Sequence, residues 1–191
     1  MVFCNKSHYV TRAPLYDEHV KVIVRHKAGA EVEFGNTLLL TEQGDGLIVD
    51  WELFRDPAPA DARLLKQSQE HLKERLGIDV HLVVADRGFD SEANRFYLEK
   101  ENTFNAVCPR NPQQLQQRLQ EEAFREAQNH RSQTEARISI LGRCFCGNPM
   151  KQKSYAYRNL HMGLSILTHN LWVLARLKLA QAQELRSDQA A

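Results

Sequence analysis

The segment DVHLVVADRGFDSEANRFYLEKENTFNAVCPR, residues 79–110, decides the fold class of this chain. Its first seven residues form a compact apolar run that is typical of a strand buried on both faces, and Asp86 follows directly. Ser91 is a favoured N-cap residue, so a short helix is expected to begin there. The run 104–110 has the pattern of a second short buried strand. Strand, helix and strand in this order indicate an α/β fold.

The residues before this segment predict a hairpin and a helix. Two β-rich runs, 34–41 and 47–54, flank an Asp-Gly pair at Asp45, and such a pair between strand-like runs is a strong hairpin signal. Residues 61–76 place leucines at helical spacing, and Gly77 follows as a C-terminal stop.

Two further helices are expected after residue 110. The stretch 112–141 is rich in Gln, Glu and Arg and predicts a long polar helix. Residues 147–149, Gly-Asn-Pro, interrupt the chain, and 155–185 predict a final helix. Helices that alternate with a mixed sheet give an α/β class. The final helix carries an apolar stripe that must pack on something: Leu160, Leu164, Leu167, Leu171 and Leu174.

Composition indicates a soluble protein in which charge is unevenly distributed. The 191 residues are 42% hydrophobic, and no apolar run approaches the ~20 residues that cross a bilayer. The N-terminus lacks the apolar core of a signal peptide, so the cytoplasm is the expected location. The net charge of +1 combines −5 over residues 1–108 with +6 over 109–191. A basic half suits a polyanionic partner, although helices near a C-terminus are often basic by chance.

Two acidic residues are candidates for chemistry. Asp86 follows a buried strand, where ligand sites of α/β sheets gather, but it also suits a simple turn or helix cap. Glu135 shares a helix face with Arg131, four residues earlier, and with Ile138. Its partner is either Arg131, in an ion pair, or a divalent cation shared with Asp86.

Several stretches together resemble a known family. The run VVADRGFDSEANRFYLEKENTFNAVCPR resembles the second-aspartate block of DDE transposases from bacterial insertion sequences. HRSQTEARISILGRCFCGNP, followed by YRNLHMGLSILTHNLWVLAR, resembles their glutamate block and closing helix, and EVEFGNTLLL resembles the second strand of their RNase H-like domain. The resemblance covers residues 16–178, and its blocks occur in the expected order.

This resemblance implies an RNase H-like mixed sheet flanked by helices, with a C-terminal amphipathic helix. It also implies phosphoryl transfer on DNA by two Mg²⁺ ions held by three acidic residues. Asp86 would be the second acid and Glu135 the third, with Arg131 supporting the glutamate or a phosphate. The first acid lies on an upstream strand in the family, and Asp17 is the first candidate for it, with Asp50 as a fallback.

The chain departs from the family in two places. Only about 30 residues precede the EFG strand, so we expect a truncated transposase with a partial or irregular segment at 1–30. A core at 31–142 would then be incomplete at its N-terminus, and 143–191 would form a basic connector and closing helix. Gly142 also stands seven residues after Glu135, where the family usually has a basic residue. The residues expected to contact DNA phosphates are Arg143, Lys151, Lys153 and Arg158.

The sequence therefore predicts a transposase that binds Mg²⁺ and DNA, with reduced or no activity, associated with the bacterial nucleoid. One alternative is a catalytically inactive fragment that binds DNA or forms multimers with a full-length relative. Another is a nuclease of the same fold that cuts DNA without element specificity. Self-association into a homo-oligomer is compatible with each of these readings.

Overall fold

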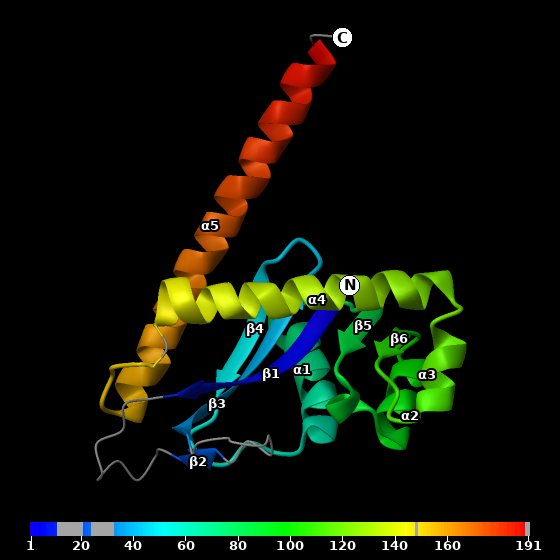
Figure 1. The fold of residues 1–191 in the computed structure, drawn as a ribbon, viewed down its shortest axis with the longest axis horizontal. Coiled ribbons are helices and arrows are strands. Elements are labelled where there is room, and N and C mark those ends of the chain that lie inside the picture. The colour runs from blue at the N-terminus through cyan, green and yellow to red at the C-terminus, as the bar shows by residue number, and fades with distance from the viewer. Residues whose placement is uncertain (11–20, 24–32, 148, 190–191) are drawn as a thin grey trace.

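A computed structural model describes residues 1–10, 21–23, 33–147 and 149–189. The described residues form one six-stranded mixed sheet covered by helices on both faces (Figure 1). The strand order is β2-β3-β1-β5-β6, and β4 pairs with β3 beside β2. β1 runs antiparallel to β3 and parallel to β5, which is parallel to β6. The strands are β1 (Val2–Val10), β2 (Lys21–Ile23), β3 (Glu33–Gln43), β4 (Ile48–Leu53), β5 (Leu82–Ala85) and β6 (Phe104–Val107).

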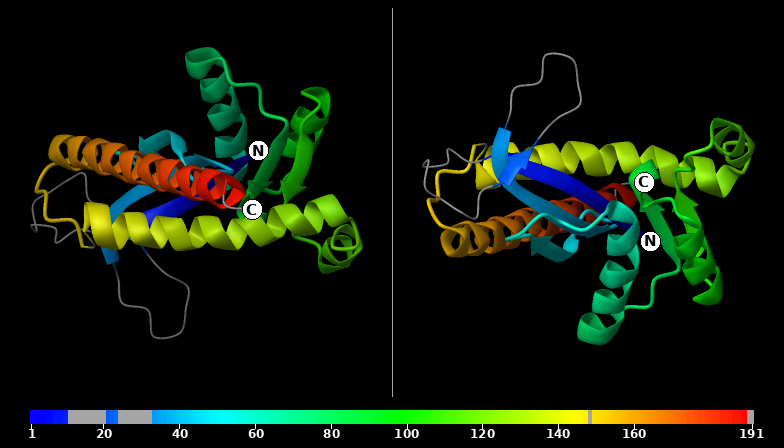
Figure 2. Two further views of the ribbon diagram at one scale, coloured as in Figure 1. Left: turned by 90° about the horizontal axis from the view of Figure 1, so that it is seen from above. Right: turned by 90° about the horizontal axis from the view of Figure 1, so that it is seen from below.

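Helices α1 and α2 cover one face of the sheet, and α4 and α5 cover the other (Figure 2). A 3-10 turn, Arg87–Phe89, follows β5, and a π-helical turn, Leu141–Cys146, continues α4. The helices are α1 (Asp61–Leu76), α2 (Glu92–Lys100), α3 (Pro112–Arg118), α4 (Glu122–Ile140) and α5 (Tyr155–Gln189). None of the described helices is long and apolar enough to cross a membrane.

Side chains of the central strands alternate between two apolar cores, as the pleat of a strand requires. Cys4 of β1 and Ala85 of β5 join the core beneath α1. Phe3 and Val84, one residue earlier in each strand, join the core beneath α4, together with Phe124 of that helix. This alternation fixes which residues at the end of β5 face α4.

The predicted hairpin and helix caps are confirmed. The β3–β4 turn closes with a hydrogen bond from the Gly46 N–H to the Gln43 carbonyl (2.9 Å), and Gly46 has a φ of 97° that favours glycine. Gly77 ends α1 in the left-handed conformation (φ 63°). The Ser91 hydroxyl accepts a hydrogen bond from the Asn94 N–H (3.2 Å) at the start of α2.

The prediction of an irregular N-terminal segment is wrong for residues 2–10. These residues form β1, which lies in the sheet between β3 and β5. Because β1 is central, its contiguous Val2-Phe3-Cys4 run is buried on both faces, whereas its polar second half gave no strand signal. Lys6 instead pairs with Asp61 at the start of α1, at 2.7 Å. The core therefore has a strand upstream of β3, where the sequence predicted an incomplete sheet.

The single long helix predicted over 112–141 is also wrong, because the chain breaks it into α3 and α4 around residues 119–121. The Arg118 guanidinium lies over the rings of Phe104 and Phe124, at 5.5 and 4.8 Å from their centroids. These contacts fix the end of α3 against the sheet, and no glycine or proline marks the break in the sequence.

Candidate active site

Asp86 lies at the carboxyl end of β5, on the side of the sheet that α4 covers. Its Oδ1 accepts a hydrogen bond from the Arg87 N–H (2.8 Å), so the side chain caps the 3-10 turn that follows. The carboxylate is nevertheless 59% exposed. Asp86 therefore combines the structural role of a cap with access to solvent, which a ligand-binding carboxylate requires.

Glu135 reaches the same place from α4. Arg131 Nη1 lies 2.6 Å from Glu135 Oε1 and 3.7 Å from Asp86 Oδ1, so one guanidinium nitrogen touches both carboxylates. Gln128, one turn earlier, accepts a hydrogen bond from Arg131 Nε (3.2 Å) and donates one to the Ala106 carbonyl of β6 (2.7 Å). The structure thus brings together the three residues that the sequence singled out, in what we call the Asp86–Glu135 cluster.

The strand beside β5 carries an amide side chain level with Asp86. Cys4 pairs with Ala85, so Asn5 is level with Asp86 on the neighbouring strand. Because side chains alternate, Asn5 faces α4, as Phe3 does. The sequence of β1, VFCNKSHYV, contains no Asp or Glu. Sequence reasoning missed Asn5 because it did not identify β1 as a strand.

A third carboxylate on this face is already paired. Glu42 of β3 lies beside Phe3 of β1 and is only 3% exposed. Burial raises its pKa, against the opposing effect of the Arg137 guanidinium, which pairs with it from α4. This pair ties α4 to the sheet and is separate from the exposed Asp86–Glu135 cluster.

Of the two candidates for the first acid, Asp50 does not join the cluster. Asp17 lies outside the described residues. Asp50 of β4 contacts His71 of α1 at 3.6 Å, and α1 lies on the opposite face of the sheet from α4. Burial raises the pKa of Asp50, while His71 acts in the other direction.

The residues of the cluster fit a divalent cation only in part. Two carboxylates on one face, with open access for water, suit a single hard cation such as Mg²⁺. A two-metal site of three carboxylates is not assembled by the described residues, which contain no group of three or more His, Cys, Asp or Glu able to hold a metal ion. Arg131 supplies positive charge between the two carboxylates.

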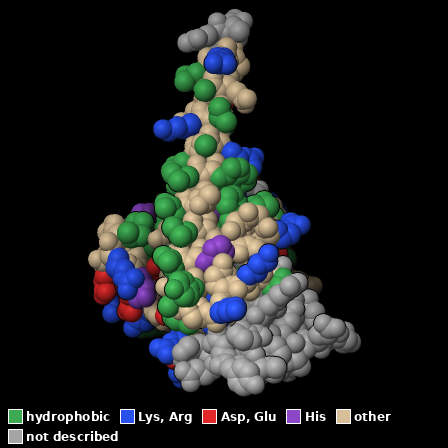
Figure 3. All heavy atoms as spheres, turned by 90° about the vertical axis from the view of Figure 1, so that its left-hand side faces the viewer, with side chains coloured by type: hydrophobic (Ala, Val, Ile, Leu, Met, Phe, Trp, Pro, Cys, Tyr) green, Lys and Arg blue, Asp and Glu red, His purple; other side chains and the backbone are tan. Residues whose placement is uncertain are grey.

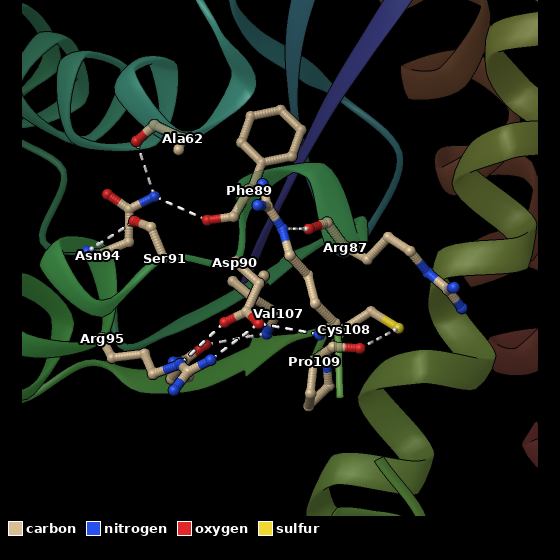
Figure 4. A network of polar contacts seen from close by, with 12 residues as sticks. Ala62, Arg87, Phe89, Asp90, Ser91, Asn94, Arg95, Val107, Cys108 and Pro109 are labelled. Atoms are coloured by element: carbon tan, nitrogen blue, oxygen red, sulfur yellow. Dashed lines mark hydrogen bonds and ion pairs between the residues drawn. The ribbon is translucent and has the colours of Figure 1, made fainter. Parts of the chain in front are cut away.

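A polar network fixes the loop that carries Asp86 (Figure 4). The Asp90 carboxylate accepts two hydrogen bonds from Arg95 and one from the Arg110 N–H, each at 2.9 Å. Burial alone would raise the pKa of Asp90, but these donors outweigh it and hold the pKa below its ordinary value. The Asn94 amide donates to the carbonyls of Ala62 (2.8 Å) and Phe89 (2.7 Å). The loop is therefore held from α1, α2 and the end of β6.

Of the four basic residues expected at a DNA surface, three are exposed: Arg143, Lys151 and Lys153. Arg158 is fully buried, and its Nη1 donates to the carbonyls of Gln152 (3.4 Å) and Lys153 (3.2 Å). This burial corrects the prediction for Arg158, because its guanidinium holds the segment before α5 rather than facing solvent.

Comparison with solved structures finds transposases. A piggyBac transposase synaptic complex with hairpin DNA matches with a TM-score of 0.64 and 9% identity, covering 95% of this chain and 48% of that chain. The Mos1 mariner paired end complex with Mn matches with a TM-score of 0.40 and 12% identity, covering 90% of this chain and 53% of that one. The chain thus spans about half the length of these proteins, and the first likeness confirms the RNase H-like fold.

Comparison with curated proteins finds no match. The family model of the transposase DDE domain, in contrast, matches residues 10–155. That range is most of the chain, and it includes Asp86, Arg131 and Glu135. The chain therefore belongs to the transposase DDE domain family.

Proposed function

We propose that this chain acts on DNA as a transposase domain, by metal-dependent phosphodiester cleavage and strand transfer. The observation that supports this proposal is that Asp86 and Glu135 both contact Arg131. Two carboxylates far apart in the sequence thus lie together at the end of one strand. Their exposure leaves room for a phosphate and a cation. Other polar residues fix the loop beneath them, which suits chemistry that depends on positioning.

In this proposal Asp86 and Glu135 hold the divalent cation. When bound, Mg²⁺ or a similar ion neutralises phosphate charge and activates the attacking oxygen. Arg131 orients both carboxylates and offers N–H donors to a phosphate oxygen. Every one of these groups lies on the α4 side of the sheet, so DNA would approach along that side.

We further propose that the chain alone has reduced or no activity. Asn5 is level with Asp86 on the neighbouring strand, and a neutral amide cannot supply the charge that a carboxylate gives to a divalent cation. Asp17 stays a candidate for the first acid, while Asp50 would require a rearrangement, since its partner is His71 of α1.

The test is a gain of function at Asn5. Supercoiled plasmid and labelled oligonucleotides are incubated with the wild type and with Asn5→Asp in the presence of Mg²⁺ or Mn²⁺. We expect little nicking by the wild type, metal-dependent nicking by Asn5→Asp, and loss of that nicking when Asp86→Asn is added. Ser7→Asp is the matched control, because Ser7 lies two residues along the same strand face. Robust joining of element ends by the wild type would contradict reduced activity and point to Asp17.

A second candidate function is a catalytically inactive DNA-binding fragment. Two observations favour it: β1 carries no acid, and Arg143, Lys151 and Lys153 are exposed. Phosphate neutralisation does not need the metal site, so DNA binding should survive Asp86→Ala with Glu135→Ala.

Salt dependence of DNA binding tests this second candidate. In a fluorescence anisotropy titration, Lys151→Ala with Lys153→Ala should make the plot of log K against log salt shallower by about 2, roughly 0.9 per phosphate contact. Lys66→Ala with Lys100→Ala, on α1 and α2, is the control expected to leave the slope unchanged. Nicking by the wild type of plasmids that lack element ends would instead favour a nuclease of the same fold.

A further inference from the structure

Helix α5 has two apolar faces, and the body of the protein uses only one of them. Met162 and Ile166 are buried in the core formed with β3 and β4, and Val173 is buried on the same side. The Asn170 amide exchanges two hydrogen bonds with the backbone of Ile48 at the start of β4, at 3.0 and 2.8 Å. These contacts settle how α5 sits on the sheet.

The other face is exposed, although the sequence predicted that its leucines would pack on something. Each of its large side chains is at least 42% exposed, and hydrophobic side chains follow the length of the helix in Figure 3. Figure 1 shows the helix continuing past the rest of the described chain. We call this face the leucine seam; it consists of Tyr157, Leu160, Leu164, Leu167, Leu171, Leu174 and Leu185.

The seam has the spacing of a coiled coil. Its first six members follow one another at alternating intervals of three and four residues. Lys178 and Gln181 take the next two positions, and Leu185 resumes the pattern. Four heptads of this kind extend over roughly 43 Å at 1.5 Å per residue. A strict 3.5-residue period is the pattern that faces another helix along its whole length.

We propose that the leucine seam binds the seam of a second copy of this chain, forming a two-helix coiled coil. Charge favours a second copy, because the positions flanking the seam on both sides carry only Glu184 and His161 as ionisable groups. Lys178 is the only charged group within the seam, so two seams repel one another little and a polyanion finds little to bind.

The exposed area of the seam is close to that of one side of a standard protein interface. From their fractional exposures, its seven side chains present on the order of 700 Å² in each copy, near the roughly 800 Å² per partner of a standard interface. The sheet lies against the opposite side of α5, where Met162 and Ile166 are buried. Two copies can therefore pair through their seams with both sheets on the outside.

The experiment measures the mass of the full chain by sedimentation equilibrium at micromolar concentrations. We expect the wild type to sediment at twice its 22.0 kDa, and the double variant Leu164→Glu with Leu171→Glu to sediment at the mass of one chain. Leu179→Glu is the matched control: Leu179 is 63% exposed, comparable with 59% for Leu171, but lies off the seam. It should remain a dimer.

Two results would overturn the proposal. One is a wild type that stays monomeric across the concentration range, and the other is a dimer that persists in the double variant. Because the seam is exposed, its glutamates should leave the fold intact, which circular dichroism verifies. Flotation with vesicles of neutral and anionic phosphatidyl lipids tests whether the seam binds a membrane surface instead. Vesicle binding by a monomeric wild type that is lost in the double variant would assign the seam to a membrane surface and refute the dimer.

Discussion

Two regions of the sheet, the carboxyl end of β5 and the edge formed by β4, are stabilised by different kinds of contact. At the end of β5, polar contacts dominate: Asp90 is bound by Arg95 and Arg110, and Arg131 lies between Asp86 and Glu135. At the β4 edge, apolar packing dominates, with buried side chains from β3, β4, the π-helical turn and α5 in one core. The first arrangement specifies positions of charged groups, whereas the second supplies stability.

The same contrast separates the two long helices. Beneath α4 the apolar core is small, with Phe124 and Ala127 as its contributions, and the Arg137–Glu42 pair adds a polar anchor. Helix α5 has more apolar surface than its contact with the sheet buries. Helix α4 therefore presents charged side chains at the end of β5, whereas α5 closes an apolar core and leaves a second apolar face exposed.

The largest effect on folding stability is expected at the β4 edge. Met162→Ala removes a side chain that is fully buried and contacts Cys146 Sγ at 3.5 Å. Such a truncation costs about 2–5 kcal/mol through lost burial and the cavity left behind. Urea unfolding followed by circular dichroism measures it. Leu179→Ala, at an exposed position on the same helix, should change the unfolding free energy by less than about 0.5 kcal/mol. Equal costs for the two variants would show that burial in the core at the β4 edge does not supply stability.

A smaller, pH-dependent effect is expected at the polar end. Asp90→Asn loses charge-assisted hydrogen bonds from Arg95 to a carboxylate that is 4% exposed, and should cost about 2 kcal/mol at pH 7. Because the pKa of Asp90 is lowered in the folded state, its stabilisation is complete above the ordinary value of 3.8. It is lost as pH falls through the lower folded value.

Unfolding of the wild type and Asp90→Asn from pH 7 to pH 2.5 tests this sign. The difference should shrink below about pH 4. Glu42 and Asp50, whose pKa values burial raises, titrate in both proteins and cancel in the difference. Glu99→Gln, at an exposed position of α2, is the control. A difference that is constant with pH would show that Asp90 acts by shape rather than charge.

Local signals explain what the sequence predicted. The hairpin, α1 and α2 are predictable because each has a turn or cap signal that lies within a few residues: Asp45-Gly46, Gly77 and Ser91, respectively. The cluster of Asp86, Arg131 and Glu135 is predictable from the sequence. Helical spacing places Arg131 beside Glu135, and the family resemblance links Asp86 to Glu135.

Tertiary contacts explain what the sequence did not predict. Residues 2–10 have no alternating pattern, because β1 is buried on both faces at its start and carries at its centre Lys6, which pairs with Asp61. Because β1 was not identified as a strand, the sequence did not predict that Asn5 lies beside Asp86 on the neighbouring strand. The break before α4 depends on Arg118 stacking on Phe104 and Phe124, and the burial of Arg158 depends on carbonyls of its own connector.

The smallest stability effect is expected at the Asp86–Glu135 cluster itself. Arg131→Ala removes the cation from two carboxylates that are 59% and 53% exposed. Exposed ion pairs of this kind contribute about 0.3–0.5 kcal/mol and are screened by salt. The expected loss is within about 0.5 kcal/mol at low salt and vanishes at high salt, with Arg125→Ala at an exposed position of α4 as the control. A charged cluster that contributes so little to folding is free to serve ligand binding. A loss of unfolding free energy as large as that of Asp90→Asn would instead show that Arg131 stabilises the fold. The Asp86–Glu135 cluster and the loop held by Asp90 would then not differ in role.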